Sequence, residues 1–430
     1  MTESQPGLRK NSPERSRRVD IALLAIIFVV GIFLRVTPGA FSPGGSLHFL
    51  APLHPQPAWT KLGFDEGLYR EYVNAVSKNG LTSYPDIVEG YIDVQQKLPG
   101  SILPPLRFLY IFTAYVWHSS FGSEALSALQ QVAAFFSMLT LALAAFFVWR
   151  MRGPIWAIAI AALMTFAPTQ IHMSQHALVD GFFTFWATLV LWLIWENLQA
   201  PRDWRWLVGY VVALALLVLT KENSFFVWIA LIALLITNRW LQFGLVTREL
   251  VIATFLGPLL GVVVLIFLAG GIYTFVQSYS LSVGKNFQLH YAILTGDGPW
   301  YRYLVDLMLV SPVVLILAFG TLFRLNRGMK PELFMSIFLA ASYLVMCNVK
   351  YGMNLRYANM WDLPLRFLAF GEIVWLASLA KRFQTTIIAA AVVLLAAIEF
   401  HQYIVLAVRY PLYELITHDL LQALSILKGP

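Results

Sequence analysis

Eleven long apolar runs, separated by polar segments, constrain this chain more than any other feature. They lie near residues 20–37, 125–149, 154–171, 178–198, 206–220, 224–238, 250–269, 303–323, 332–348, 362–380 and 385–404. An α-helix needs about 20 mostly apolar residues to cross a bilayer. Hydrophobic residues make up 59% of the chain and mean hydropathy is +0.68, which a soluble chain of this length does not reach. The sequence predicts an all-α polytopic membrane protein with about 11 transmembrane helices.

The basic residues decide how these runs cross the membrane, because cytoplasmic loops carry an excess of Lys and Arg. One further apolar run, at 102–117, could be another span or a helix lying in the interface. If it does not cross, the N-terminus and every short cytoplasmic loop carry at least two basic residues. If it crosses, the bias is reversed in each later loop. We therefore expect 11 spans, with the N-terminus inside and the C-terminus outside.

This topology divides the chain into a few parts. They are a basic cytoplasmic N-terminus (1–18), a multi-span membrane domain (19–404) with long outer loops at 38–124 and 271–302, and an outer tail (405–430). The first loop is expected to be catalytic and the second to bind substrate. The first loop should also hold amphipathic interfacial helices near 66–78 and 102–117, with ordered turns between them at Gly and Pro residues.

The net charge of +7 does not indicate a nucleic-acid partner, because the basic residues cluster in short loops where they orient the spans. The basic N-terminus leads into the first apolar run, which predicts a retained signal-anchor. The single cysteine, Cys347, excludes an intrachain disulfide. We expect an integral protein of the bacterial inner (plasma) membrane that acts on the extracytoplasmic side.

Two adjacent carboxylates, Asp65 and Glu66, stand in the first outer loop of a chain in which only 12% of residues are charged. Acidic residues at a membrane border cost desolvation energy and often mark function. A carboxylate there can act as a general base on a substrate that lies in the lipid. Because acids also favour the first turn of a helix, a solvated helix start is the structural alternative.

Most other polar residues that need explaining are also predicted to lie on the outer side. The candidates for substrate binding are Lys97, Asp180, Lys221, Lys285, Arg356 and Tyr357. Such cations suit a phosphate group, since Arg offers a bidentate fork and Lys a point charge. The structural alternatives are a solvated loop for Lys97, a snorkelling lysine paired with Glu222 for Lys221, and an interfacial anchor for Arg356.

His172, His176 and Asp180 are spaced four apart, so in a helix they would share one face. That spacing suits metal ligands. Polar residues at the boundary of a span are nevertheless ordinary. We expect no metal ligands and no cofactor, with a divalent ion as the alternative.

Several short motifs together resemble the C-type glycosyltransferase superfold, in the branch of the protein O-mannosyltransferases and the lipid A aminoarabinose transferases. The motifs are Asp65-Glu66-x-x-Tyr69, Leu103-Pro104-Pro105-Leu106, Phe121-Gly122-Ser123-Glu124-Ala125, Pro168 followed by Ser174 and Asp180, Leu219-Thr220-Lys221-Glu222, and Asn354-Leu355-Arg356-Tyr357. The chain departs from this branch at Leu103, where many relatives have a basic residue before the Pro-Pro pair. It departs again at Gln130-Gln131, where many have Arg.

The resemblance implies an inverting transfer of a sugar from a polyprenyl-phosphate donor to an unknown lipid, glycan or protein acceptor. Asp65 would be the base that takes the acceptor proton. Lys97, Lys285 and Arg356 would contact the donor phosphate, and Tyr357 could add a hydrogen bond.

A transporter or flippase of lipid-linked sugars is the competing class. It would also need many spans, but it usually shows paired broken helices with polar residues at mid-membrane. No such pair is evident in the sequence. Arg35, near the end of the first span, is the one charged residue that departs from this pattern, and we expect its side chain to snorkel toward the interface.

Overall fold

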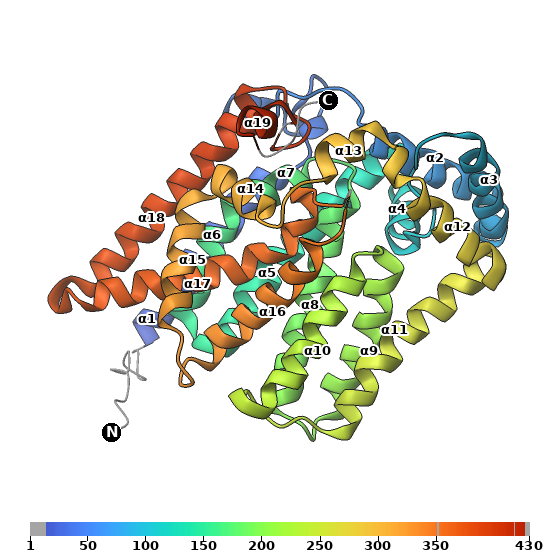
Figure 1. Cartoon of the computed structure of the whole chain (residues 1–430). Helices are drawn as coiled ribbons and strands as arrows, with labels where there is room; N and C mark the ends of the chain where they lie inside the picture. The colour runs from blue at the N-terminus through green and yellow to red at the C-terminus, as the bar shows by residue number, and fades with distance from the viewer. Residues whose placement is uncertain (1–13, 351, 417, 426–430) are drawn as a thin grey trace.

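The computed structural model describes residues 14–350, 352–416 and 418–425, and these residues form helices and connecting segments without a strand (Figure 1). Most of the predicted cytoplasmic N-terminus, 1–18, and the end of the outer tail lie outside the described residues. The all-α polytopic class predicted from the sequence is confirmed at this level.

Each predicted apolar run contains one or two of the helices. The helices are α1 Glu14–Arg35, α2 Phe64–Asn79, α3 Tyr84–Lys97, α4 Phe108–Phe121, α5 Ala125–Arg152, α6 Pro154–Thr165, α7 Pro168–Ser174, α8 Val179–Gln199, α9 Trp204–Thr220, α10 Ser224–Leu241, α11 Arg248–Leu268, α12 Ile272–Gly284, α13 His290–Gly296, α14 Arg302–Val310, α15 Pro312–Arg324, α16 Lys330–Met346, α17 Asp362–Ser378, α18 Gln384–Tyr403 and α19 His418–Ala423. Short 3₁₀ or π turns include η5 Leu355–Trp361, η6 Lys381–Phe383 and η7 Ile404–Arg409.

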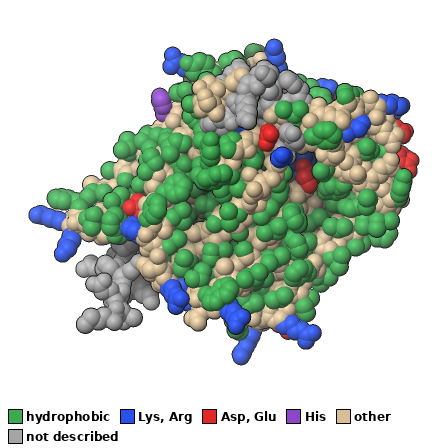
Figure 2. Space-filling view, in the orientation of Figure 1, with side chains coloured by type: hydrophobic (Ala, Val, Ile, Leu, Met, Phe, Trp, Pro, Cys, Tyr) green, Lys and Arg blue, Asp and Glu red, His purple; other side chains and the backbone are tan. Residues whose placement is uncertain are grey.

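Five helical segments of the described chain are long and apolar enough to cross a membrane by themselves. They are α5, α8, α10, α11 and Lys381–Arg409, which comprises η6, α18 and η7. The pair α6 and α7 makes a sixth if it is one span, bent by 59°. α9 and α15 contain shorter apolar helices. Figure 2 shows hydrophobic side chains over most of one face, as expected where a bundle contacts lipid.

The bend between α6 and α7 is stabilised by Arg35, the last residue of α1. Pro168 begins α7 and lacks the N–H that would continue the ladder of α6. The Arg35 guanidinium instead donates to the backbone oxygens of Met164 at 2.8 Å and Thr165 at 3.2 Å. Arg35 is 1% exposed. The expectation that it snorkels is therefore wrong, because broken backbone inside the bundle provides its acceptors.

The first outer loop folds into a helical layer against the end of the bundle. Figure 1 shows α2, α3 and α4 at the end opposite to the N-terminus and the α10–α11 loop. Tyr69 of α2 and Tyr110 of α4 are fully buried in a second apolar core that also includes residues of α3, α5 and α8. Helices are present near both expected places, as α2 and α4, but the second begins at Phe108, six residues later than the expected run at 102–117.

The expectation that turns fill the segment between them is wrong over 84–97, which is α3. Pro85 lies in the first turn of this helix, where its missing N–H costs nothing. Gly90 is tolerated on its exposed face. A turn does occur at Gly80, whose φ of 82° ends α2.

A buried ionic cluster joins α7, α17 and α18. Arg366 pairs with Asp362 at 2.6 Å and with Glu399 at 2.5 Å. Thr169 of α7 donates to the same Asp362 carboxylate. Each charge in this cluster has an opposite partner, as a charge buried within a membrane bundle requires.

Candidate active site

Glu66 anchors the start of α2 to the bundle. Its carboxylate accepts the backbone N–H groups of Gly63 and Ala177, both at 2.7 Å. The His176 ring lies 3.4 Å away. Burial alone would raise the pKa of Glu66, but His176 and the two amides favour the carboxylate and lower it. Since both oxygens are occupied, Glu66 fixes the position of its neighbour Asp65.

Asp65 points the other way and pairs with Arg356. Its Oδ2 atom lies 2.6 Å from Nη2 of Arg356, and its side chain is 17% exposed. Arg356 belongs to η5, where Asn354 caps the turn by accepting the Arg356 N–H at 3.0 Å. The structure therefore brings the predicted base and the predicted phosphate contact together, although 291 positions separate them in the sequence.

Asp180 joins Arg356 to a second cation, Lys221. Oδ1 of Asp180 lies 2.5 Å from Nζ of Lys221, and Oδ2 lies 3.8 Å from Nε of Arg356. The Tyr357 ring stands beside both cations, 3.8 Å from Lys221 Nζ and 5.3 Å from the Arg356 guanidinium. Burial lowers the pKa of Lys221 to about 8, although Asp180 acts in the opposite direction. Four of the predicted binding residues thus share one site with Asp65.

Arg107 is a neighbouring cation that the sequence analysis did not single out. Its guanidinium donates to the Tyr69 hydroxyl at 2.6 Å and forms a two-armed ion pair with Glu222. Burial opposes the charge of Glu222, but Arg107 and Lys221 outweigh burial and lower its pKa to about 2. The available signal was the position of Arg107, two residues after the Pro-Pro pair.

Glu414, from the predicted outer tail, also belongs to the site and was not foreseen. Its Oε1 atom lies 3.8 Å from Nη1 of Arg356, and it accepts the Tyr291 hydroxyl at 2.7 Å. Burial raises the pKa of Glu414, and the nearby Arg356 opposes this only in part. The neighbouring Tyr413 lies beside Gly63, where even one added carbon would be 2.5 Å from its ring.

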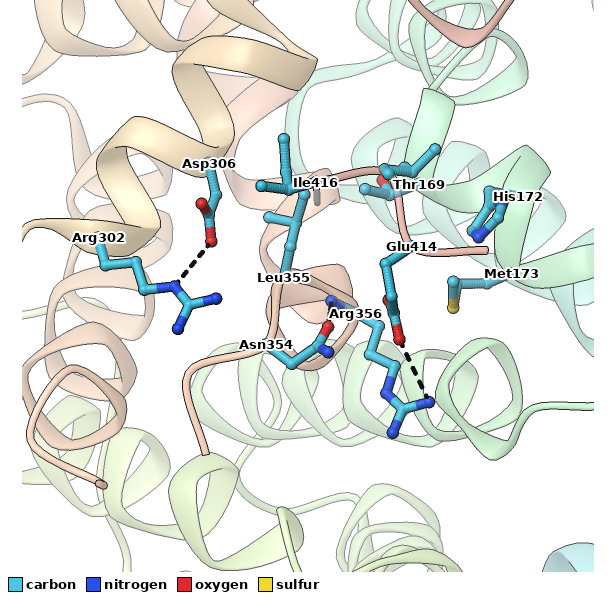
Figure 3. A pocket seen from close by; sticks show the side chains of 11 residues that line it. Thr169, His172, Met173, Arg302, Asp306, Asn354, Leu355, Arg356, Glu414 and Ile416 are labelled. Carbon is cyan, nitrogen blue, oxygen red and sulfur yellow. Dashed lines mark hydrogen bonds and ion pairs between the residues drawn. The ribbon is translucent and has the colours of Figure 1, made fainter. Parts of the chain in front are cut away.

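A small cavity of about 20 Å³ lies beside this site. Figure 3 shows Arg356 and Glu414 on one side of it and the pair Arg302–Asp306 on the other, with Leu355 and Ile416 between them. A volume of this size has room for about one water molecule. The cavity therefore adds a polar recess to the site and is too small to hold a sugar.

The structure does not place Lys97 and Lys285 in this site. Lys97 is exposed at the end of α3. Nζ of Lys285 donates to three backbone oxygens at the end of the same helix, at distances of 2.6, 3.0 and 2.6 Å. The last carbonyls of a helix have no intrahelical partner and carry partial negative charge, so they attract a lysine.

The three residues considered as metal ligands point to different partners. Asp180 pairs with Lys221, His176 faces Glu66, and the Nε2 atom of His172 lies 2.7 Å from the Tyr413 backbone oxygen. Among the residues that the structure describes, no three His, Cys, Asp or Glu side chains are grouped closely enough to hold a metal ion. This donor set does not fit a bound divalent ion.

The arrangement as a whole combines a partly exposed carboxylate with two buried cations at one end of an apolar bundle. Figure 2 shows acidic and basic side chains side by side in a hollow of the otherwise mostly hydrophobic face. Such a site can accept a proton at Asp65 while Arg356 and Lys221 stabilise an anion.

Comparison with known proteins agrees with the resemblance found in the sequence. Residues 109–284 match the family described as dolichyl-phosphate-mannose-protein mannosyltransferase, a match that covers under half of the chain. The matched segment contains nearly all of α4, the helix that follows Arg107, together with Asp180 and Lys221. It does not contain Asp65 or Arg356. None of the curated protein sequences matches this chain.

Solved structures share the fold. ArnT from Cupriavidus metallidurans in the apo state superposes with a TM-score of 0.53 at 16% identity, covering 85% of this chain and 64% of that one. ArnT bound to undecaprenyl phosphate superposes with a TM-score of 0.51 at 15% identity, covering 92% of this chain and 72% of that one. The Archaeoglobus fulgidus oligosaccharyltransferase tethered with an acceptor peptide superposes with a TM-score of 0.58 at 13% identity, covering 90% of this chain and 55% of that one. The chain thus has the fold of C-type membrane glycosyltransferases but spans only about half to three-quarters of their length.

Proposed function

We propose that this protein is an inverting glycosyltransferase that moves a sugar from a polyprenyl-phosphate donor to an acceptor on the extracytoplasmic side of the membrane. The observation that carries the proposal is the convergence of Asp65, Arg356 and Lys221 at one end of an apolar bundle. The family matched at 109–284 uses a dolichyl-phosphate sugar, and a protein with the same fold has been captured with undecaprenyl phosphate.

The donor would bind with its lipid tail along the apolar face and its phosphate at Arg356 and Lys221. No hydrogen-bond acceptor among the described residues is paired with Nε of Arg356, which leaves this donor for a phosphate oxygen. Lys221 is 1% exposed, so its charge acts in a region of low dielectric constant.

In the reaction, a carboxylate oxygen of Asp65 takes the proton of the acceptor hydroxyl or amine. The acceptor atom attacks the anomeric carbon from the face opposite to the phosphate, and a new glycosidic bond forms with inversion. The bond between the anomeric carbon and the phosphate oxygen breaks, and its electron pair stays on the leaving polyprenyl phosphate. Arg356 and Lys221 stabilise the charge that develops there.

The proposed topology has 11 spans, a cytoplasmic N-terminus and the site on the outer side of a bacterial inner membrane. The arrangement of the outer loops supports it, because α2, α3, α4 and α13 lie at the same end as the site (Figure 1). Within the chain, the first outer loop supplies Asp65, and the second supplies Tyr291.

A transporter or flippase of lipid-linked sugars is the second candidate, and one observation favours it. The bend of 59° between α6 and α7 and the break between α14 and α15 at Ser311 interrupt two apolar runs inside the bundle. A flippase would move the donor across a vesicle membrane without releasing the sugar, so the fate of the donor distinguishes the two functions.

The test uses purified protein in nanodiscs with polyprenyl-phosphate-linked hexose or pentose and candidate acceptors. Release of polyprenyl phosphate and of the glycosylated acceptor is measured by mass spectrometry. Wild-type protein should release both, and Asp65→Asn should release neither while still binding undecaprenyl phosphate. Translocation of intact donor in vesicles, with no release by any donor, would replace the transferase by the flippase.

A further inference from the structure

The ion pair that fixes Arg356 also occupies one oxygen of the proposed base. Nη2 of Arg356 lies 2.6 Å from Oδ2 of Asp65, so an acceptor group cannot approach Oδ2 from that side. An acceptor has to lie within hydrogen-bond reach of the carboxylate oxygen that takes its proton. For Oδ2 to act, the guanidinium has to leave it before the acceptor is deprotonated.

Arg356 has a second carboxylate within reach, on the other arm of its guanidinium. Nη2 faces Asp65, and Nη1 faces Glu414 at 3.8 Å. The contact to Glu414 is therefore open by about one ångström relative to a charge-assisted hydrogen bond. Arg356 therefore forms a close ion pair with Asp65 and a longer one with Glu414.

Glu414 is held firmly where it stands. The Tyr291 hydroxyl, from α13 in the second outer loop, donates to its Oε1 atom at 2.7 Å. The adjacent Tyr413 is fixed by the His172 ring, which lies 2.7 Å from its backbone oxygen, and by its packing against the rings of Trp59 and His176. Because these contacts fix the Glu414 carboxylate, the Arg356 guanidinium can move to pair with it while Glu414 stays in place.

We propose that Glu414 is a positioning residue that takes over the Arg356 guanidinium when the donor phosphate binds, and so frees Asp65 to act as the base. The proposal rests on the function proposed above. The phosphate competes with Asp65 for Arg356, and Glu414 holds the guanidinium on the phosphate side. Donor binding thereby activates the base, and the donor binds before the acceptor is deprotonated.

The charge of Glu414 gives this proposal a signature that a structural role lacks. Glu414→Gln removes the carboxylate that receives the guanidinium, so Arg356 should stay with Asp65. Undecaprenyl phosphate should then bind more weakly and kcat should fall about tenfold. The melting temperature should stay at the wild-type value, because the variant changes the charge at this position and keeps the shape of the side chain.

The test compares Glu414→Gln, Glu414→Asp and Tyr291→Phe in nanodiscs, with the exposed Glu89→Gln on α3 as the matched control. Glu414→Asp should recover part of the lost kcat, Tyr291→Phe should lose less than Glu414→Gln, and the control should equal the wild type. An unchanged kcat in Glu414→Gln, or a loss of kcat that is accompanied by a lower melting temperature and is not recovered in Glu414→Asp, would overturn the proposal.

A structure of the wild-type protein with undecaprenyl phosphate tests the same idea without any variant. Arg356 should move away from Asp65 and approach both the phosphate and Glu414. If Arg356 stays on Asp65 with the phosphate bound, the positioning role is rejected while the transferase stands. If neither undecaprenyl phosphate binding nor sugar transfer is found, the proposed function and this inference both fall.

Discussion

Lys221 and Asp180 form a buried ion pair, 2.5 Å long, between the end of α9 and the first turn of α8. The pair lies beneath Arg356, and both of its members are at most 3% exposed. Since removing one partner of a buried pair leaves the other uncompensated, the two residues are expected to act as a unit.

Burial lowers the pKa of Lys221 to about 8, so its charge is lost as the pH rises through about 8. A neutral lysine attracts a phosphate less strongly. The affinity for undecaprenyl phosphate should therefore fall on the alkaline side, measured by scintillation proximity from about pH 6.5 to about pH 9.5. Lys221→Met should bind more weakly throughout and lack this alkaline fall. An identical pH profile in Lys221→Met would assign the titration to another group.

Asp65→Asn should abolish transfer, because the amide keeps the shape of the side chain and cannot accept the proton. The loss in kcat should be about 10²–10⁴-fold, the usual contribution of a general base. Expression and thermal stability should stay close to those of the exposed control Asp93→Asn on α3. Measurable transfer at the wild-type rate would remove Asp65 from the mechanism.

Arg356→Ala should weaken the binding of undecaprenyl phosphate by about tenfold to a hundredfold, since a hydrogen bond to a charged group is worth about 1.5–3 kcal/mol. Arg356→Lys should recover only part of this affinity, because an ammonium group does not reproduce the fork of the guanidinium. Equal affinity in wild type and Arg356→Ala, in the same nanodisc assay, would mean that the phosphate binds elsewhere.

Arg366→Met should lower the thermal stability of the protein strongly. It leaves Asp362 and Glu399 buried without their cation, which typically costs about 3–5 kcal/mol. The melting temperature in detergent should drop, whereas that of the exposed control Arg382→Met should not. A melting temperature equal to that of the wild type would show that this cluster does not stabilise the bundle.

The proposed topology can be tested with single cysteines in a Cys347→Ser background. Cys replacing Gly284, which is exposed and has no atom within 4 Å of an added carbon, should react with an impermeant thiol reagent in intact cells. Cys replacing the exposed Asn326 should react only after the membrane is opened. The opposite pattern would invert the topology and place the site in the cytoplasm.

The sequence was sufficient to identify the helical class, because helix formation in a membrane follows from local apolar length. The sequence also singled out Asp65, Asp180, Lys221, Arg356 and Tyr357 as polar residues beside apolar runs, and the structure places them close together. Their convergence is long-range, and no local pattern encodes it.

The residues that sequence reasoning misplaced or missed were decided by tertiary contacts. Lys285 has the charge expected of a phosphate ligand, but the free carbonyls at the end of α3 bind it instead. Glu414 lies in a tail with no recognisable motif, and its role depends on how that tail folds back over η5. The helix α3 was missed because its Pro and Gly residues are typical of turns, whereas here they occupy the first turn and an exposed face.

The contacts of Arg35 have a consequence for how the chain is made. Arg35 ends α1, but its acceptors Met164 and Thr165 follow 129 and 130 residues later in the chain. At ordinary rates of translation this gap lasts roughly ten seconds. During that time an arginine destined for the interior of the bundle must wait at the membrane border. Nascent chains truncated before α6 should therefore be recognised as unfinished and degraded, while chains that extend beyond α7 should persist.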